Sequence, residues 1–367
     1  MKLQLLIIFL LTVLVGCRDQ KGKNYTFFVG TYTDGDSEGV YKYSIAKDGK
    51  LQNLGVAAVL ENPSFLAKST DDKFLLAVNE ISNTDSVGAV ASFKIMNDSL
   101  TPVNTSSSGG AHPCFVSVND AGYVLTANYT GGNVGLLKLD SNGALSALLD
   151  VQQHSGKGMT DRQEGPHAHS AWFTSTNNTV ISVDLGTNEL WFSQLDTIQQ
   201  KLIPADPNRL QMAPGAGPRH LTFHPNGKWI YVVNELNGTV TLVQKNANGI
   251  YEKGSSIATL PEGFKEPNTC ADIRISSDGK FVYASNRGHN SIVIFAVNDH
   301  NGSLSLVAHE ATRGDGPRNF SLTPDDNYLL VANQLTNNII SFKRDKTTGL
   351  LYYVDAIEAS TPVCILF

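Results

Sequence analysis

Positive charge is scarce in this 367-residue sequence, which has 28 Lys and Arg against 34 Asp and Glu and a formal net charge of −6. A nucleic-acid partner normally requires a basic surface, so the composition argues against one. A sustained amphipathic helical pattern is also missing, which favours an all-β protein. The 32 glycines agree with this class, as do turn signals such as Asp48-Gly49, Asn226-Gly227 and Asp278-Gly279 between alternating apolar segments.

Cysteines are few, and their number does not suggest a disulfide framework. Apart from Cys17 near the N-terminus, the sequence contains Cys114, Cys270 and Cys364, each in a different short apolar segment. An odd number of widely separated cysteines argues against structural disulfides, even outside the cytoplasm. We therefore expect three buried free thiols.

Long hydrophobic runs are limited to one, from Leu3 to Val15, which follows the basic start Met1-Lys2. This run is short for a bilayer-spanning helix but fits the core of a secretory signal. The Gly16-Cys17 pair at its end resembles a bacterial lipoprotein signal; an ordinary signal peptide with a chance cysteine is the alternative. We predict a signal peptide over residues 1–17 with Cys17 lipidated and a tether over 18–24. The protein would then be an exported bacterial lipoprotein, held at the periplasmic or cell-surface face of a membrane only by its lipid.

A pattern that recurs seven times organises the rest of the sequence. A copy consists of a short apolar segment, a turn, a second apolar segment ending in Asn or Asp, and an apolar residue after a later polar turn. Six first segments start at Pro63, Pro113, Pro166, Pro218, Cys270 and Pro317, and the six second segments end at Asn79, Asn128, Asp184, Asn234, Asn286 and Asn333. The repeat length of about 45–55 residues is that of a four-stranded propeller blade.

The seventh copy is divided between the two ends of the sequence. Tyr25–Thr31 reads as a second strand without a first strand before it, and Thr361–Phe367 reads as a first strand with nothing after it. Pairing them completes a blade and closes the ring, which removes unpaired strand edges. A solenoid or a pair of sandwiches would not explain this division. The sequence therefore predicts an all-β, seven-bladed β-propeller, closed by the C-terminal strand, over residues 25–367 as one domain.

The hairpin turns predict which residues meet at the centre of the ring. Counting back from the Asn226-Gly227 turn places Arg219 opposite Asn234, and the same count in the next repeat places Ala271 opposite Asn286. These positions lie at the open ends of their hairpins. Because the innermost strands line the channel of a propeller, the open ends should converge on one rim of a central funnel.

Cations gather at this rim. Three repeats carry Gly-Pro followed by a cation, namely His167, Arg219 and Arg318, and Arg287 adds a further guanidinium. Guanidinium groups suit carboxylate or phosphate, so a small anionic molecule is the natural ligand. Alternatively, Arg219 and Glu235 are an ion pair that holds one hairpin, and the recurring Asn residues only cap strand ends.

One repeat departs from the others. It has His167 and His169 on the same side of a first strand, a pair that the other repeats lack. The connection before it, from Val151 to Gly165, is long and contains His154, Arg162, Gln163 and Glu164. Such a departure from the repeat indicates a functional site in this blade. The long loop is then either a binding element or an ordinary surface loop.

The segment Arg162-Gln163-Glu164-Gly165-Pro166-His167-Ala168-His169-Ser170-Ala171 resembles the signature of the seven-bladed lactonase family. That family includes the propeller-type 6-phosphogluconolactonases and the carboxy-muconate lactonising enzymes. The segments Gly217–Pro225, Tyr231–Glu235, Ser285–Ile292 and Val29–Thr33 are similar to the family as well. The resemblance covers essentially the whole chain after the leader and implies the same propeller fold.

The resemblance also implies an activity and a site. The family's proposed catalytic residues fall on His169 (or His167), Arg219, Glu235 and Arg287. We expect hydrolysis of a small anionic or sugar-derived lactone without metal or cofactor, by a monomer, with His169 or Glu235 as base and the two arginines at the oxyanion. The rest of the expected binding surface consists of His167, His220, Arg318, Asn79, Asn128, Asn234 and Asn286. Three alternatives remain at this point: a carboxy-muconate-type cyclase, a calcium-dependent lactonase, and a surface propeller that binds a glycan or protein without catalysis.

Overall fold

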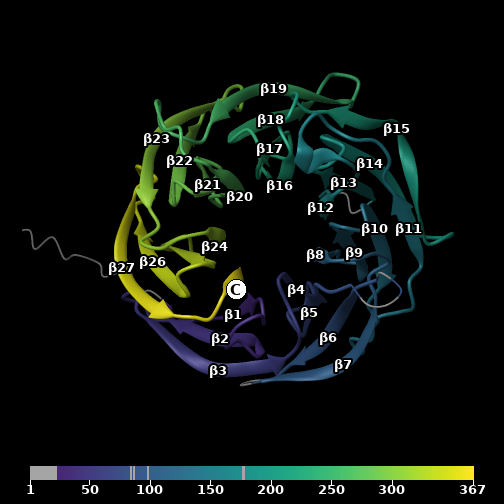
Figure 1. Cartoon of the computed structure of the whole chain (residues 1–367), viewed down its shortest axis with the longest axis horizontal. Coiled ribbons are helices and arrows are strands. Elements are labelled where there is room, and N and C mark those ends of the chain that lie inside the picture. Colours follow the sequence, from purple (N-terminus) through teal and green to yellow (C-terminus); the bar gives the residue numbers. More distant parts are fainter. Residues whose placement is uncertain (1–22, 83–84, 86, 97–98, 176–177) are drawn as a thin grey trace, which may run out of the picture.

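Seven four-stranded antiparallel sheets form a ring in the computed structural model, which describes residues 23–82, 85, 87–96, 99–175 and 178–367. Figure 1 shows the sheets as blades around a central axis. The innermost strands are β4 (Leu66–Lys68), β8 (Pro113–Val118), β12 (Ala168–Phe173), β16 (Pro218–Phe223), β20 (Thr269–Ile275), β24 (Pro317–Leu322) and β28 (Pro362–Leu366). The predicted signal peptide and lipidation site lie outside the described residues.

The other three strands of each blade follow outward in chain order. The second strands are β5 (Phe74–Asn79), β9 (Tyr123–Asn128), β13 (Thr179–Asp184), β17 (Trp229–Asn234), β21 (Phe281–Arg287), β25 (Tyr328–Asn333) and β1 (Tyr25–Thr31). The third are β6 (Ala89–Ile95), β10 (Asn133–Lys138), β14 (Glu189–Asp196), β18 (Thr239–Lys245), β22 (Ser291–Val297), β26 (Asn338–Arg344) and β2 (Gly39–Ile45). The outermost are β7 (Leu100–Ser107), β11 (Asp150–Gln153), β15 (Lys201–Gln211), β19 (Tyr251–Ala258), β23 (Leu304–Ala311), β27 (Leu351–Glu358) and β3 (Leu51–Val59). One short 3-10 helix, η1 (Asp161–Gln163), interrupts the long connection before β12.

The closing blade confirms the predicted division of the seventh repeat. Its strand order is β28-β1-β2-β3, with Val29 opposite Ile365 and Gly30 opposite Cys364. The C-terminal strand therefore occupies the innermost position and the N-terminal strand the second, as Figure 1 shows near the label C. The seven-bladed propeller predicted from the repeat is the fold of this chain.

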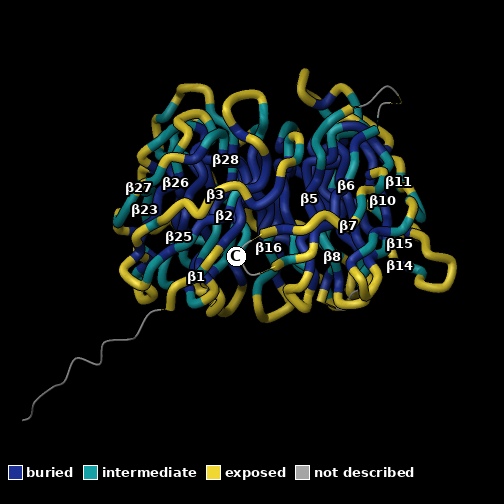
Figure 2. The backbone as a smooth tube through the Cα atoms, turned by 90° about the horizontal axis from the view of Figure 1, so that it is seen from below, coloured by how far each residue is buried: buried dark blue, intermediate teal, exposed yellow. Residues whose placement is uncertain are grey.

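The core lies between the blades, and it follows from the alternation in the strands. Residues of the second strands are mostly buried, whereas the outermost strands are largely exposed (Figure 2). Tyr231 and Val233 of β17 pack in one cluster with Ile273 of β20 and Val282 of β21 in the next blade. Each sheet thus covers its apolar faces with its neighbours, which is why a blade cannot be stable alone.

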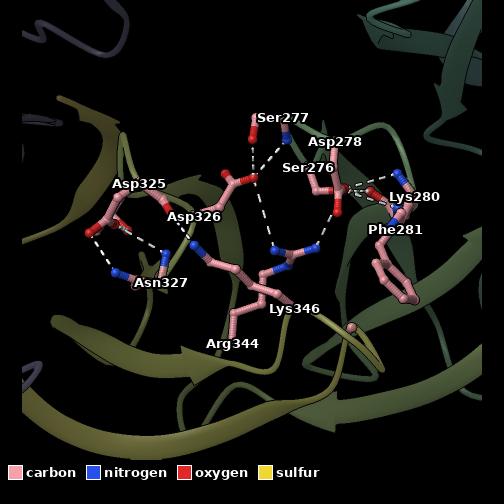
Figure 3. Close-up of polar contacts among 12 residues, drawn as sticks. Ser276, Ser277, Asp278, Lys280, Phe281, Asp325, Asp326, Asn327, Arg344 and Lys346 are labelled. Carbon is pink, nitrogen blue, oxygen red and sulfur yellow. Dashed lines mark hydrogen bonds and ion pairs between the residues drawn. The ribbon is translucent and has the colours of Figure 1, made fainter. Parts of the chain in front are cut away.

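Tyrosines tie neighbouring blades at their outer turns. The hydroxyl of Tyr231 donates to the carbonyl of Gly302 at 2.8 Å, and that of Tyr283 donates to Gly349 at 2.9 Å, each in the following blade. A buried arginine strengthens one of these contacts, since Arg344 Nε donates to the Tyr283 hydroxyl at 2.7 Å. Figure 3 shows the Arg344 guanidinium between Asp278 and Asp326, which are 3.9 Å away on the turns of two adjacent blades.

The three cysteines Cys114, Cys270 and Cys364 are free and buried at the innermost strands, as predicted. In the part of the chain that the structure describes, no helix is long and apolar enough to cross a membrane.

Candidate active site

A β-bulge at the start of the innermost strands sets the geometry of the channel mouth. In β16, His220 pairs with Val233 but Pro218 pairs with Asn234, so Arg219 is an extra residue without a partner. The turn count is correct as far as His220, and its placement of Arg219 opposite Asn234 is wrong. A bulge leaves one residue out of the ladder and turns its side chain in a new direction.

The same irregularity recurs around the ring. The extra residues are Cys114 in β8, His169 in β12 and Arg318 in β24. In each strand, the residues before and after the extra one pair with two consecutive residues of the second strand. In β20 the irregularity is larger, because Cys270 pairs with Asn286 and the next paired residue is Ile273. The predicted pairing of Ala271 with Asn286 is therefore also wrong. The residues displaced by the bulges include three of the side chains that the sequence singled out: His169, Arg219 and Arg318.

Glu235 is the centre of the charge cluster at this mouth. It directly follows β17, and 4% of the residue is exposed. Three guanidinium groups bind its carboxylate: Arg219 Nε and Arg287 Nη2 lie 3.1 and 3.2 Å from Oε2, and Arg162 Nη2 lies 3.1 Å from Oε1. The predicted Arg219–Glu235 ion pair is thus present, but it is buried and belongs to a larger cluster.

Electrostatics keep this carboxylate ionised. Burial alone would raise the pKa of Glu235, but the charges of Arg287, Arg219, Arg162 and Arg318 outweigh it, and the pKa lies below its ordinary value. Burial in turn lowers the pKa of Arg287 to about 10, which leaves it charged at neutral pH. Two of these arginines are also fixed by backbone carbonyls: Arg219 Nη1 donates to Ala271 at 2.6 Å, and Arg287 Nη2 donates to Cys270 at 3.0 Å.

His169 lies deeper in the channel and is uncharged. Burial, together with the nearby charges of Arg219, His220 and Arg318, keeps the pKa of His169 well below its usual value. Its Nδ1 is 3.6 Å from the Sγ atom of Cys114. Burial raises the pKa of that thiol, so the pair is a neutral imidazole beside a neutral thiol and not a thiolate–imidazolium pair.

His220 lies below the mouth rather than on it. Its Nδ1 is 2.9 Å from Asp272 Oδ1, and Asp272 Oδ2 binds Arg274 Nη2 at 3.1 Å and accepts from Asn319 Nδ2 at 2.6 Å. Burial and the Arg219 charge lower the pKa of His220 to about 4 despite the adjacent carboxylate. The His220 ring is buried and fixed to Asp272, and it lines a small cavity together with Arg219 and Arg318, so its role in substrate binding stays a prediction.

A second polar cluster crosses the closing blade. Arg318 Nη2 donates to the Tyr32 hydroxyl at 2.8 Å, and that hydroxyl donates to Glu80 Oε2 at 3.0 Å. The hydroxyl of Ser64 donates to the same carboxylate oxygen. Arg318 also acts on Glu235, which places it at the mouth as predicted, and it lines a cavity of about 10 Å³ together with Arg219 and Ser64.

The long connection before β12 is folded against the mouth. His154 Nδ1 is 2.7 Å from Asp184 Oδ2, and the His154 ring stacks on Trp191 with centroids 4.1 Å apart. His167 stacks on Tyr129 at 4.5 Å, and its Nε2 is 3.1 Å from Glu164 Oε1. The connection is thus packed against the blades, and its role as a binding element stays a prediction.

The recurring asparagines bind groups within their own blades. Asn128, Asn234 and Asn286 are fully buried. Asn128 donates to Ser108 and Asn133, Asn234 to Thr239 and Thr241, and Asn286 to Thr259 and Ser291. The amide of half-buried Asn79 donates to the carbonyl of Glu61. Their predicted contact with substrate stays a prediction, and the described contacts of these side chains lie within the protein.

Arg162 and Tyr129 are the residues of this mouth that the predicted site left out. Arg162 Nη2 donates to the Tyr129 hydroxyl at 2.9 Å while it binds Glu235. The signal that could have identified Arg162 was its place in the one loop that departs from the repeat. Tyr129 follows Asn128 directly and gave no separate signal.

The other end of the channel has a cavity of about 540 Å³. It is lined by the far ends of the innermost strands, mostly by apolar side chains such as Phe115 and Trp172, and also by Lys68, Asp120 and Arg274. A buried carboxylate bound by three guanidinium groups is found at the mouth around Glu235, which is therefore the candidate site. Among the described residues, no group of three or more His, Cys, Asp or Glu side chains is placed to hold a metal ion.

Comparison with known proteins assigns the chain to a family. Residues 26–367 match the family described as lactonase, 7-bladed beta-propeller. A protein of Bacillus subtilis named 6-phosphogluconolactonase is 36% identical over 349 residues, which cover 94% of this chain and 98% of the relative.

Solved structures agree with this match. The crystal structure of a putative 6-phosphogluconolactonase from Bacteroides fragilis has a TM-score of 0.87 at 35% identity and covers 94% of this chain and 98% of that chain. The periplasmic gluconolactonase of Pseudomonas aeruginosa has a TM-score of 0.89 at 30% identity, with the same coverage. Together with the match over nearly the whole chain, the seven-bladed ring shows that this protein belongs to the lactonase family with a seven-bladed β-propeller.

Proposed function

We propose that this protein hydrolyses a sugar lactone of the 6-phosphogluconolactone type at the mouth around Glu235. The relatives named as 6-phosphogluconolactonases support the reaction class, since they cover nearly the whole chain. The observation that carries the proposal is a buried, ionised carboxylate held by three guanidinium groups at an open rim. Such a cluster combines a proton acceptor with donors for a developing oxyanion.

In the proposed reaction, the oxygen of a water molecule attacks the lactone carbonyl carbon while Glu235 accepts a proton from that water. The carbonyl oxygen becomes an oxyanion, which the guanidinium groups of Arg219 and Arg287 stabilise. Collapse of the intermediate breaks the bond between the carbonyl carbon and the ring oxygen, and the proton held by Glu235 passes to the departing alkoxide. The products are a free hydroxyl group and a carboxylic acid, and the carboxylate of Glu235 is restored.

Glu235 is favoured over His169 as the base because of where each lies. Glu235 Oε1 contacts Arg162, whose side chain is 51% exposed, so this oxygen faces the side from which a substrate enters. His169 is buried beside Cys114. Its neutral imidazole can accept a hydrogen bond from a substrate hydroxyl or from water, and it is the second candidate for the base.

Substitutions at Glu235 test the proposal on a panel of lactones, with rates corrected for spontaneous ring opening. Glu235→Gln removes the basicity, and the rate should fall about 10²–10⁴-fold. Because removal of one charge from a buried cluster can destabilise it by about 3–5 kcal/mol, Glu235→Asp is measured beside it, and rates are normalised to folded protein. Glu235→Asp keeps the charge but shortens its reach, so the protein should stay folded and lose most of its activity.

Glu262→Gln, at an exposed position, is the matched control. Glu235 variants with near-parental rates would contradict the proposal, and a loss confined to His169→Asn would transfer the role to His169.

We further propose that the protein is exported and anchored through Cys17, as its first residues predict. The P. aeruginosa relative named as a periplasmic gluconolactonase supports an exported location. Phosphorylated sugars are scarce outside the cytoplasm, so this location would favour a lactone derived from a sugar or a sugar acid.

A further inference from the structure

Arg162 differs from the other two partners of Glu235 in its exposure. The Arg162 side chain is 51% exposed, compared with 3% for Arg219 and 17% for Arg287. It is the partner that contacts Oε1, whereas the other two bind Oε2. Because the Arg162 side chain reaches solvent, water can hydrate its guanidinium when it leaves Glu235, so this contact is exchanged more easily than the two buried ones.

The backbone beneath Arg162 is held firmly. The neighbouring Gln163 is fully buried, and its Nε2 donates to the carbonyl of Leu185 at 2.8 Å and to Asn188 Oδ1 at 3.2 Å. The amide of Gly158 donates to the carbonyl of Gln163 at 2.9 Å, which closes the turn. Rotation of the Arg162 side chain therefore suffices to move its guanidinium away from Glu235, and the loop does not have to open.

The mouth has an excess of positive charge. Arg162, Arg219, Arg287 and Arg318 all act on Glu235, and the second carboxylate of this region, Glu80, is engaged by Tyr32 and Ser64. A third carboxylate, Glu164, also acts on Arg162, so four guanidinium groups face three carboxylates. A ligand that carries its own negative charge is favoured here, and Arg162 is the guanidinium most accessible to it.

We propose that Arg162 is an exchangeable partner of Glu235: a second anionic group on the lactone, a phosphate or a carboxylate, binds the Arg162 guanidinium and frees Oε1 to accept the proton of water. This inference rests on the proposed function, in which Glu235 is the base. It makes Arg162 a specificity-determining residue, which distinguishes lactones that carry such a group from neutral ones.

The exchange couples recognition to reactivity. With Arg162 in place, Oε1 is covered and a third positive charge weakens Glu235 as a base. Once the Arg162 guanidinium has moved to the substrate anion, Glu235 keeps its two contacts at Oε2, with Arg219 and Arg287. The other charged or titratable groups that act on it are Arg318, Tyr129 and Cys270. The basicity of Oε1 rises as a result. A neutral lactone cannot draw Arg162 away and is hydrolysed by a base that stays covered for most of the time.

The experiment compares Arg162→Gln with the parent on three lactones. These are 6-phosphoglucono-lactone with a phosphate, glucaro-lactone with a carboxylate, and neutral glucono-lactone. Arg313→Gln is the matched control, because the Arg313 side chain is 50% exposed and pairs with Glu310 away from Glu235. Rates are measured from pH 4 to 8, and binding of inorganic phosphate is measured in parallel by calorimetry.

For Arg162→Gln, kcat/KM should fall about 10–100-fold on the anionic lactone that is the better substrate of the parent, the usual worth of a hydrogen bond to a charged group. On neutral glucono-lactone the rate should rise, because Oε1 is no longer covered. In the pH dependence of the rate on glucono-lactone, the fall in rate at acid pH should move to higher pH, because loss of a positive charge raises the pKa of Glu235. Arg313→Gln should resemble the parent, and phosphate binding should weaken only in Arg162→Gln. Whichever of the two anionic lactones loses its advantage identifies the anion that is recognised.

An equal fall on all three lactones with an unshifted pH profile would overturn the inference, since a merely structural role of Arg162 predicts it. Equal phosphate affinity in the two arginine variants would do so as well. If the parent hydrolyses none of the lactones, the proposed function fails, and the phosphate measurement still decides whether Arg162 binds anions.

Discussion

Weakening the strand that closes the ring should destabilise the whole protein. The innermost strand of the closing blade, β28, contains Val363, Cys364 and Ile365, each 2% exposed. Ile365 packs in a cluster with Phe27 and Val29 of the N-terminal strand, and its backbone amide donates to Asn319 Oδ1 at 2.7 Å. Through its side chain and its backbone amide, Ile365 thus connects β28 with both β1 and β24.

The size of the effect follows from burial. Truncation of a buried isoleucine to alanine typically costs about 2–5 kcal/mol, and a whole domain is stable by about 5–15 kcal/mol. Ile365→Ala should therefore lower the melting temperature by on the order of 5 °C. Deletion of residues 361–367 should abolish soluble folded protein, because the buried side of β1 would become an open edge. Ile198→Ala is the matched control, since Ile198 is 94% exposed.

Thermal unfolding followed by circular dichroism gives the comparison, with soluble yield as the measure for the deletion. If Ile365→Ala melted within about 1 °C of Ile198→Ala, or if the deletion variant were as soluble as the parent, ring closure by β28 would not contribute the stability argued here.

Two further predictions concern acid stability and the lipid anchor. Because the pKa of His220 is lowered from 6.5 to about 4 in the folded state, its contribution is complete above pH 6.5 and is lost as pH falls from 6.5 towards 4. The melting temperature should therefore drop over this range and drop less steeply in His220→Asn; an identical slope in both proteins would contradict the assignment. Cys17→Ser should abolish lipid labelling and membrane association of the exported protein, and unchanged membrane retention would count against the anchor.

The seven-bladed ring could be predicted because each blade corresponds to one copy of the repeat, and the repeat can be recognised in the sequence itself. The divided seventh copy, Tyr25–Thr31 with Thr361–Phe367, determined the number of blades and the strand that closes them. The register near the turns was also predictable, since Phe223 pairs with Ile230 as the Asn226-Gly227 turn requires. The bulges could not be predicted, because one extra residue such as Arg219 does not visibly change the alternation of apolar and polar residues in so short a strand.

The charged mouth was predicted in part. His169, Arg219, Glu235 and Arg287 lie at or just below it, although the sequence could not tell that Glu235 binds three guanidinium groups at once. The sequence could not show that Asn128, Asn234 and Asn286 are fully buried, because a residue at the end of a strand can point into the blade as easily as towards the channel. Contacts between distant segments, such as Arg162 with Glu235, depend on how a loop folds back and have no counterpart in the repeat.

The division of the last blade also sets an order for folding. In the other six blades all four strands come from one continuous segment, whereas the contact between Thr361 and Tyr32 joins residues 329 positions apart. Contacts between such distant segments form slowly, because a long loop must be closed before they stabilise anything. The consecutive blades can therefore assemble first, and the ring closes last. Since Arg318 is bound to Tyr32 of the closing blade, the charged mouth reaches its final arrangement only in that step. A chain still being synthesised would thus hold most of a propeller but not yet a finished active site.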